Sequence, residues 1–165
     1  MRFDNLYEMR EMIETFAIRK FCRGGAPAID LIRLLDALDA IWQVPLDERF
    51  TDGREVATLD KAFHQTLVSA AGNDELTAAL QCVTDRIRVV RRLDLVYGNC
   101  VDETYVEHAA ILRAIRAGRT DEAVTGAARH IRVNQAEVRK LTVPRLHSVR
   151  TTGVRRAAPD APVKG

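Results

Sequence analysis

The sequence predicts an all-α protein, an antiparallel bundle of about six to seven helices. Apolar residues recur at three- and four-residue spacings along most of the chain, and the strict alternation typical of strands is absent. Turn-forming residues divide this pattern into segments with short connections, which place consecutive helices side by side and antiparallel. The 165 residues suffice for one domain with a single hydrophobic core.

Turn signals delimit each expected helix. The first helix ends at "RGGAP", the second at Pro45, and the third at "AGND", where Gly72 suits a helix C-cap. The fourth ends at "YGN". In "AGRTDEA", Gly118 ends the fifth helix and Thr120 caps the sixth, whose acidic first turn complements the helix dipole. These signals predict helices over residues 5–22, 29–43, 53–71, 75–97, 102–117 and 120–141.

The composition is that of an ordinary globular protein, with 47% hydrophobic and 29% charged residues. No run approaches the ~20 apolar residues that a membrane span needs. The N-terminus has no secretory signal, so we expect a cytoplasmic protein. Cys22, Cys82 and Cys100 are odd in number and widely separated, which predicts reduced thiols and not a disulfide framework or a zinc pair.

Basic residues gather at the C-terminal end. The last sixteen residues, "RTTGVRRAAPDAPVKG", hold four of the 25 basic residues and one of the 23 acidic ones, which leaves a net charge of −1 on the rest. Such a nearly neutral body is a poor match to a phosphate backbone. We therefore expect one domain over residues 1–143 and a basic, disordered tail over 144–165.

Four polar residues fall on faces that should be buried. In "TLDKAFHQTL", Asp60 and His64 are four residues apart, so they project from one face of the third helix, beside apolar neighbours. His108 and His130 lie on apolar stripes of the fifth and sixth helices. Each lies ten residues from the turn between these helices, about 15 Å at 1.5 Å rise per residue, so the two imidazoles should be level.

Two interpretations of these four residues remain open. Three imidazoles and a carboxylate suit a divalent transition metal, with zinc as the first choice and nickel or manganese as alternatives. The other interpretation is a metal-free helical interaction module, in which the histidines are hydrogen-bonded core residues.

Three further residues are candidates for ligand binding. Arg10 falls on the apolar stripe of the first helix, where a guanidinium needs an anionic partner. That partner is either the carboxylate of a bound ligand or an acidic side chain such as Glu14. Arg86, next to Val83 on the fourth helix, raises the same question, and Asn134, one turn beyond His130, offers an amide.

Four segments carry a resemblance to a known family. "LYEMREMIE", "DKAFHQTLVSAAGNDEL", "EHAAILRAIRAGRTDEA" and "RHI" resemble the FCD domain, the effector-binding domain of FadR-type regulators in the GntR superfamily of bacterial transcription factors. The resemblance covers roughly residues 5–140. It implies an all-helical, metal-binding bundle in which Asp60, His64, His108 and His130 match the ligand positions. It also implies a small organic acid as effector, held with the help of Arg10, and a homodimer.

The chain departs from the family pattern at its start, because Met1 falls almost at the beginning of the effector domain. The winged helix-turn-helix domain is missing, so we expect no operator binding by this chain alone. The sequence thus predicts an effector sensor in transcription regulation and not an enzyme. The alternative is a helical metalloenzyme that acts on a small carboxylate through a metal-bound water. Glu107 is the nearest acid in sequence, but as the neighbour of His108 it should point about 100° away from it.

Overall fold

The computed structural model describes residues 3–24, 28–97 and 100–152 of the chain. The described residues form six α-helices and one 3-10 turn, and they contain no strand, so the predicted all-α fold is confirmed. The elements are α1 (Phe3–Cys22), α2 (Ala28–Trp42), η1 (Leu46–Glu48), α3 (Gly53–Ser69), α4 (Asp74–Tyr97), α5 (Val101–Arg116) and α6 (Thr120–Thr152).

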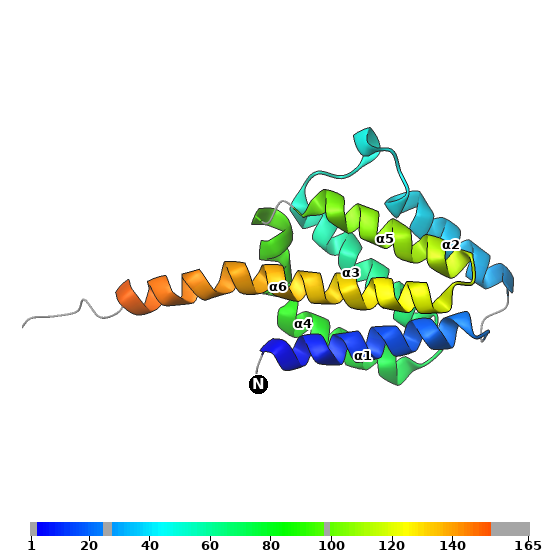
Figure 1. Ribbon diagram of the computed structural model, residues 1–165, viewed down its shortest axis with the longest axis horizontal. Helices are drawn as coiled ribbons and strands as arrows, with labels where there is room; N and C mark the ends of the chain where they lie inside the picture. The colour runs from blue at the N-terminus through cyan, green and yellow to red at the C-terminus, as the bar shows by residue number, and fades with distance from the viewer. Residues whose placement is uncertain (1–2, 25–27, 98–99, 153–165) are drawn as a thin grey trace, which may run out of the picture.

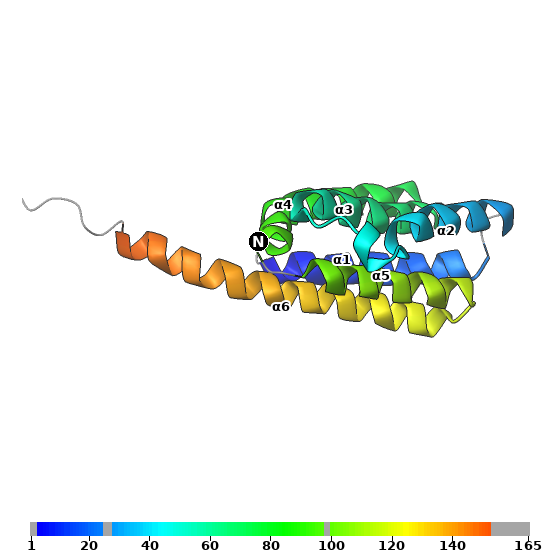
Figure 2. The same cartoon turned by 90° about the horizontal axis from the view of Figure 1, so that it is seen from above.

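The helices pack into a bundle in which α1 contacts α3, α4 and α6. The two helical hairpins α3–α4 and α5–α6 each pack side by side, and α2 lies against α5. Figure 2 shows α2, α3 and α4 along one side of the bundle and α5 and α6 along the other. In Figure 1, the C-terminal part of α6 extends well beyond the other helices.

Two clusters of buried apolar side chains hold the bundle together. One cluster joins α1, α2, α3, α5 and α6 around Trp42, Phe63 and Tyr105. The other joins α1, α3, α4 and α6 and includes Tyr7 and Ile87. Because α3 and α6 contribute to both clusters, their inward faces lie at the centre of the molecule, where a polar group has little access to water.

The turn between α5 and α6 fixes the register of these two helices. Gly118 has a φ of 68°, a left-handed conformation that glycine adopts at little cost. Its amide donates to the Ile115 carbonyl at 3.0 Å, and the Arg119 amide donates to the Ala114 carbonyl at 2.9 Å. This pair of hydrogen bonds is a Schellman motif. The predicted end of the fifth helix at Gly118 is therefore confirmed. Thr120, which we expected to cap the sixth helix, is instead the first residue of α6.

The sixth helix is longer than the sequence predicts. We expected it to end near Leu141 and a disordered tail to begin at residue 144, but α6 continues through Pro144 to Thr152. A proline removes one backbone hydrogen bond and crowds the carbonyl four residues earlier, yet a helix can continue past it with a bend. Residues 153–165 of the predicted tail lie outside the described residues. No described helix is both long and apolar enough to cross a membrane.

Candidate metal centre

The structure brings Asp60, His64, His108 and His130 together where α3, α5 and α6 meet. One potential ligand atom from each residue lies within 4.8 Å of all the others. The residues are 2%, 4%, 0% and 0% exposed, respectively. Three imidazoles and a carboxylate are therefore removed from water together, which requires a compensating interaction among them.

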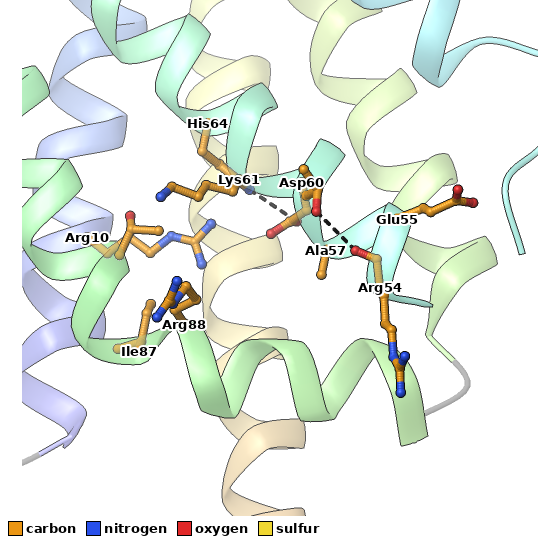
Figure 3. Close-up of a pocket in the computed structure, with 11 residues that line it drawn as sticks. Arg10, Arg54, Glu55, Ala57, Asp60, Lys61, His64, Ile87 and Arg88 are labelled. Carbon is orange, nitrogen blue, oxygen red and sulfur yellow. Dashed lines mark hydrogen bonds and ion pairs between the residues drawn. The ribbon is translucent and has the colours of Figure 1, made fainter. Parts of the chain in front are cut away.

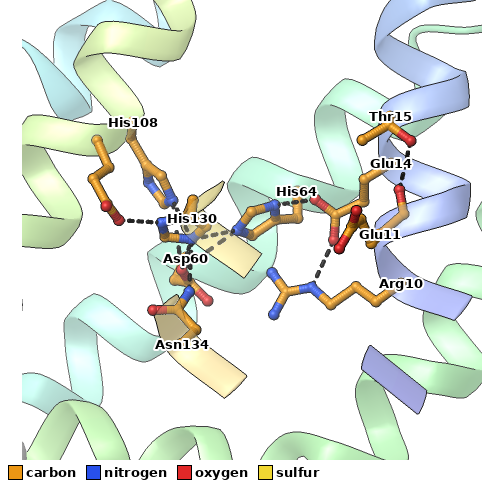
Figure 4. A network of polar contacts seen from close by, with 10 residues as sticks. Arg10, Glu11, Glu14, Thr15, Asp60, His64, His108, His130 and Asn134 are labelled. Carbon is orange, nitrogen blue, oxygen red and sulfur yellow. Dashed lines mark hydrogen bonds and ion pairs between the residues drawn. The ribbon is translucent and has the colours of Figure 1, made fainter. Parts of the chain in front are cut away.

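The potential ligand atoms face one another (Figure 4). His130 Nε2 lies 3.3 Å from both His64 Nε2 and His108 Nε2. Asp60 Oδ1 lies 3.5 Å from His64 Nε2 and from His108 Nε2, and 3.7 Å from His130 Nε2. Two ligands that share one ion tetrahedrally with bonds of ~2.0–2.1 Å are about 3.3–3.4 Å apart. Five of the six separations among these four atoms are thus close to those of atoms around a common ion.

Local structure explains the convergence. Asp60 and His64 are one turn apart on α3, and the Schellman turn sets α5 and α6 in the antiparallel register that places His108 level with His130. His108 is also held by aromatic rings. Its ring stacks on Phe63 with centroids 3.8 Å apart and meets Trp42 edge-on at 4.2 Å. The imidazole therefore has little freedom to turn away from the cluster.

Two carboxylates hold the far nitrogens of two histidines. Glu14 Oε2 lies 2.5 Å from His64 Nδ1, and Glu107 Oε2 lies 2.6 Å from His130 Nδ1. A carboxylate only accepts hydrogen bonds, so each Nδ1 carries the proton and donates it. In the neutral ring, each Nε2 is then left with a lone pair aimed into the cluster. This arrangement is typical of metal-binding histidines, whose second nitrogen is fixed by a carboxylate.

Sequence reasoning missed both of these carboxylates. We expected Glu107 to point away from the site because it is the neighbour of His108. Its side chain instead reaches across the α5–α6 interface to His130. Glu14 was considered only as a partner of Arg10. Its position on the buried stripe of α1, one turn after Arg10, was the signal that could have placed it at the site.

The chemistry of these four side chains indicates whether the cluster fits a cation. With Nδ1 of His64 and of His130 both protonated, two Nε2 lone pairs would face each other at 3.3 Å beside the Asp60 carboxylate. The Asn134 amide donates to His130 Nε2, but the described residues place no amide at His64 Nε2, so the arrangement is repulsive unless a proton or a cation lies between the atoms. A divalent cation would satisfy all four donors at once, so the donor set fits a metal.

Arg10 and Glu14 form a buried ion pair that continues to His64. Arg10 Nε lies 2.6 Å from Glu14 Oε1, and the two side chains are only 4% and 3% exposed. Burial alone would raise the pKa of Glu14, but the charges of His64 and Arg10 lower it to about 2. Burial would likewise lower the pKa of His64, and the Glu14 carboxylate raises it. The salt bridge that the sequence offered as one explanation for Arg10 is thus present.

A cavity of about 510 Å³ adjoins the cluster. Residues of α1, α3 and α4 line it (Figure 3), among them Arg10, Asp60 and His64. Arg88 also lines this cavity, whereas Arg86, the candidate from the sequence, is exposed on α4 and is not among its lining residues.

Asn134, the remaining candidate, is 5% exposed and lies at the cluster itself. Its Nδ2 donates to His130 Nε2 at 2.8 Å. The amide therefore reaches the same nitrogen that a metal would bind, one turn along α6.

The comparison with protein families agrees with the fold and the cluster. The family model described as the FCD domain matches residues 5–133, most of the chain. The chain belongs to the FCD domain family. It is accordingly an effector-binding domain of the type found in GntR-family transcriptional regulators, a class of proteins that are not enzymes. No curated protein and no solved structure matches the chain, so the assignment of the site rests on its own geometry.

Proposed function

We propose that this FCD domain binds a divalent transition metal through Asp60, His64, His108 and His130. The observation that carries the proposal is the orientation of the histidines, whose Nε2 atoms converge while carboxylates fix Nδ1 of His64 and His130. A set of three nitrogen ligands and one oxygen ligand favours zinc, with nickel and manganese as alternatives.

We propose further that the effector is a small organic acid that reaches the metal from the cavity. Asp60 and His64 belong both to the cluster and to the cavity wall, so a molecule in the cavity can reach the ion. The lining carries four cations, Arg10, Arg54, Lys61 and Arg88, against two acids, Glu55 and Asp60. The bound metal would supply a Lewis acid for one carboxylate oxygen, and the cationic lining favours an anionic guest.

Effector binding transmits a signal only if it favours one arrangement of the helices over another. The cavity offers such a coupling because its walls come from three helices, α1, α3 and α4. A carboxylate bound beside Arg10 would compete with Glu14 for the guanidinium, and Glu14 holds His64. The proposed role is therefore an effector sensor in transcription regulation. Turnover is not proposed, because the nearest further acid, Glu107, is hydrogen-bonded to the far side of His130.

We also propose that the domain forms a homodimer. Three large apolar side chains on one face of α1, Met9, Met12 and Phe16, are 39%, 65% and 56% exposed. Such a group of exposed apolar residues is more frequent at protein–protein interfaces than elsewhere on a surface. Light scattering of the purified protein gives the mass directly, and a monomeric mass would contradict this part of the proposal.

Elemental analysis of purified protein tests the metal site. We expect stoichiometric transition metal in the wild type, and its loss in both Asp60→Asn and His108→Ala. Asp85→Asn is the control, because Asp85 is an exposed residue of α4 that does not belong to the cluster. Circular dichroism identifies any variant that fails to fold. If His108→Ala does not fold, Asp60→Asn, which conserves the volume of the side chain, still tests the metal site. Wild-type protein without metal, even after reconstitution, would refute the proposal.

Organic acids are then screened by thermal shift on the metal-loaded protein, since a ligand that binds only the folded form raises the melting temperature. We expect acids to stabilise the wild type and to have a weaker effect on Arg10→Gln.

A further inference from the structure

His108 is enclosed by aromatic rings from two other helices. Phe63 of α3 stacks on the imidazole, with the ring planes 10° apart and the centroids 3.8 Å apart. The ring of Trp42, the last residue of α2, lies 4.2 Å from the imidazole, at 80° to its plane, and 5.8 Å from the ring of Phe63. These three separations form a nearly right-angled triangle whose corner is His108. Because Phe63 covers one face of the imidazole, Trp42 lies at its edge.

The two rings restrict different movements of the imidazole. Rotation about the Cβ–Cγ bond would drive the imidazole into the Phe63 ring, since the two planes are nearly parallel and in contact. A shift of the whole imidazole toward α2 would drive its edge into Trp42. His108 Nε2 lies 3.3 Å from His130 Nε2 and 3.5 Å from Asp60 Oδ1. A shift of about 1 Å would therefore take it out of bonding distance of an ion that these atoms share.

Trp42 also holds the end of α2 in the bundle. It is 1% exposed, packs against Tyr105 of α5 at 4.9 Å between ring centroids, and is the largest fully buried side chain among the described residues. Its indole N–H finds no hydrogen-bond acceptor in that part of the chain, so packing alone holds the ring. The ion pairs of α2 with α5, from Asp36 and Asp39 to Arg116, lie at the surface, where such pairs contribute little. Buried apolar side chains, Trp42 above all, therefore fix the end of α2.

We propose that Trp42 is a positioning residue of the metal site, through which metal binding and the docking of the end of α2 stabilise each other. This inference rests on the proposed metal site. Trp42 supplies none of the four potential ligand atoms, so it acts only through the imidazole of His108. Coupling between two binding events is reciprocal. If the docked indole favours the orientation of His108 that binds metal, metal binding favours the docked indole by the same factor.

Metal affinity is the first measurement. Trp42→Leu removes the ring at the edge of the imidazole and keeps an apolar side chain. Phe21→Leu is the control, because Phe21 is a buried aromatic residue of the same apolar cluster and makes no ring contact with a histidine among the described residues. Zinc affinity is measured by competition with a chelator on the folded protein. The visible absorption of bound cobalt reports the coordination geometry, which a loss of core stability alone would leave unchanged.

We expect Trp42→Leu to weaken zinc binding by about tenfold or more, the lower end of the range for groups that orient a metal ligand, and to change the cobalt spectrum. Phe21→Leu should stay within about threefold of the wild type with the same cobalt spectrum. Trp42→Phe, which retains an aromatic ring at this position, should restore most of the affinity lost in Trp42→Leu.

Hydrogen exchange of the wild type provides a second measurement that needs no variant. Zinc should slow exchange of the amides in the last turn of α2, residues 38–42, by about the factor that Trp42→Leu costs in affinity, because the coupling is reciprocal. The effect should be larger than at residues 30–34, in the first half of the same helix. This measurement decides the inference if Trp42→Leu does not fold.

The possible results separate this inference from the proposed function. Wild-type protein that binds neither zinc nor cobalt would refute the metal site itself, and the role of Trp42 with it. Wild-type binding that survives in Trp42→Leu, within about threefold and with the same cobalt spectrum, would overturn the inference alone. An equal loss of affinity in Phe21→Leu would also overturn it, as would exchange in the last turn of α2 that does not respond to zinc.

Discussion

Replacing Glu14 by glutamine should expose how strongly the carboxylates behind the metal ligands stabilise this domain. Glu14 is 2% exposed and bridges two buried partners, Arg10 and His64. Glutamine keeps the length and volume of the side chain but removes its charge. The change therefore leaves the guanidinium of Arg10, itself 3% exposed, without its carboxylate inside the core.

Two independent arguments give the size of the effect. Removing one partner of a buried ion pair typically costs about 3–5 kcal/mol, because the other charge remains buried. The pKa of Glu14 falls from 4.5 to about 2, and at ~1.36 kcal/mol per unit this corresponds to about 3 kcal/mol of stabilisation at neutral pH, where the carboxylate is ionised in both states. We expect Glu14→Gln to lower the free energy of unfolding of the metal-free protein by about 3 kcal/mol.

Metal affinity should fall as well, by about 10–100-fold, because His64 loses the carboxylate that orients it and fixes its proton on Nδ1. Urea denaturation in the presence of a chelator measures the free energy of unfolding. Titration of metal against a competing chelator of known affinity measures the metal affinity of whatever fraction of the variant is folded.

Glu11→Gln on the same helix is the matched control. Glu11 pairs with Arg132, whose side chain is 68% exposed, and exposed pairs contribute at most about 1 kcal/mol. The reasoning would be refuted if Glu14→Gln destabilised the protein no more than Glu11→Gln does, or if it left the metal affinity unchanged.

Four further outcomes are expected. Glu107→Gln should weaken metal binding by about 10–100-fold, and it should cost less stability than Glu14→Gln, because the Glu107 side chain is 18% exposed and that of Glu14 is 3% exposed. The same urea and chelator titrations check both values. Trp42, the single tryptophan, packs against His108 with ring centroids 4.2 Å apart. Its fluorescence should therefore change on addition of nickel or cobalt, and the change should saturate when the site is filled. A fluorescence change that does not saturate would contradict the metal site. Gly118→Ala should destabilise the domain by about 1 kcal/mol, measured by thermal denaturation, because alanine is strained at a φ of 68° although no atom lies within 4 Å of the added Cβ. Stripping the metal with a chelator should lower the melting temperature, since metal at 100 times its Kd contributes about 2.7 kcal/mol; an unchanged melting curve would contradict metal binding by the folded state.

The sequence by itself determined the helices and most of the cluster. Except for the C-terminal end of α6, which continues through Pro144, the helix boundaries follow closely from local rules, namely apolar spacing, glycine at turns and proline after helix ends. Such rules need no knowledge of the neighbours. The pairing of Asp60 with His64 follows from the helix period alone. The level placement of His108 and His130 follows from a tight turn and a constant rise per residue, which make distance along the chain a measure of distance in space.

The tertiary structure alone decided which carboxylates contact the histidines and which arginine of α4 lines the cavity. The contacts of Glu14 with His64 and of Glu107 with His130 join side chains of different helices, so they depend on how the helices rotate and pack, which local periodicity leaves open. The same rotation of α4 turns Arg88, and not Arg86, toward the cavity. Side chains two residues apart on a helix point about 160° apart around its axis, so only the packing of α4 against α3 could select between them.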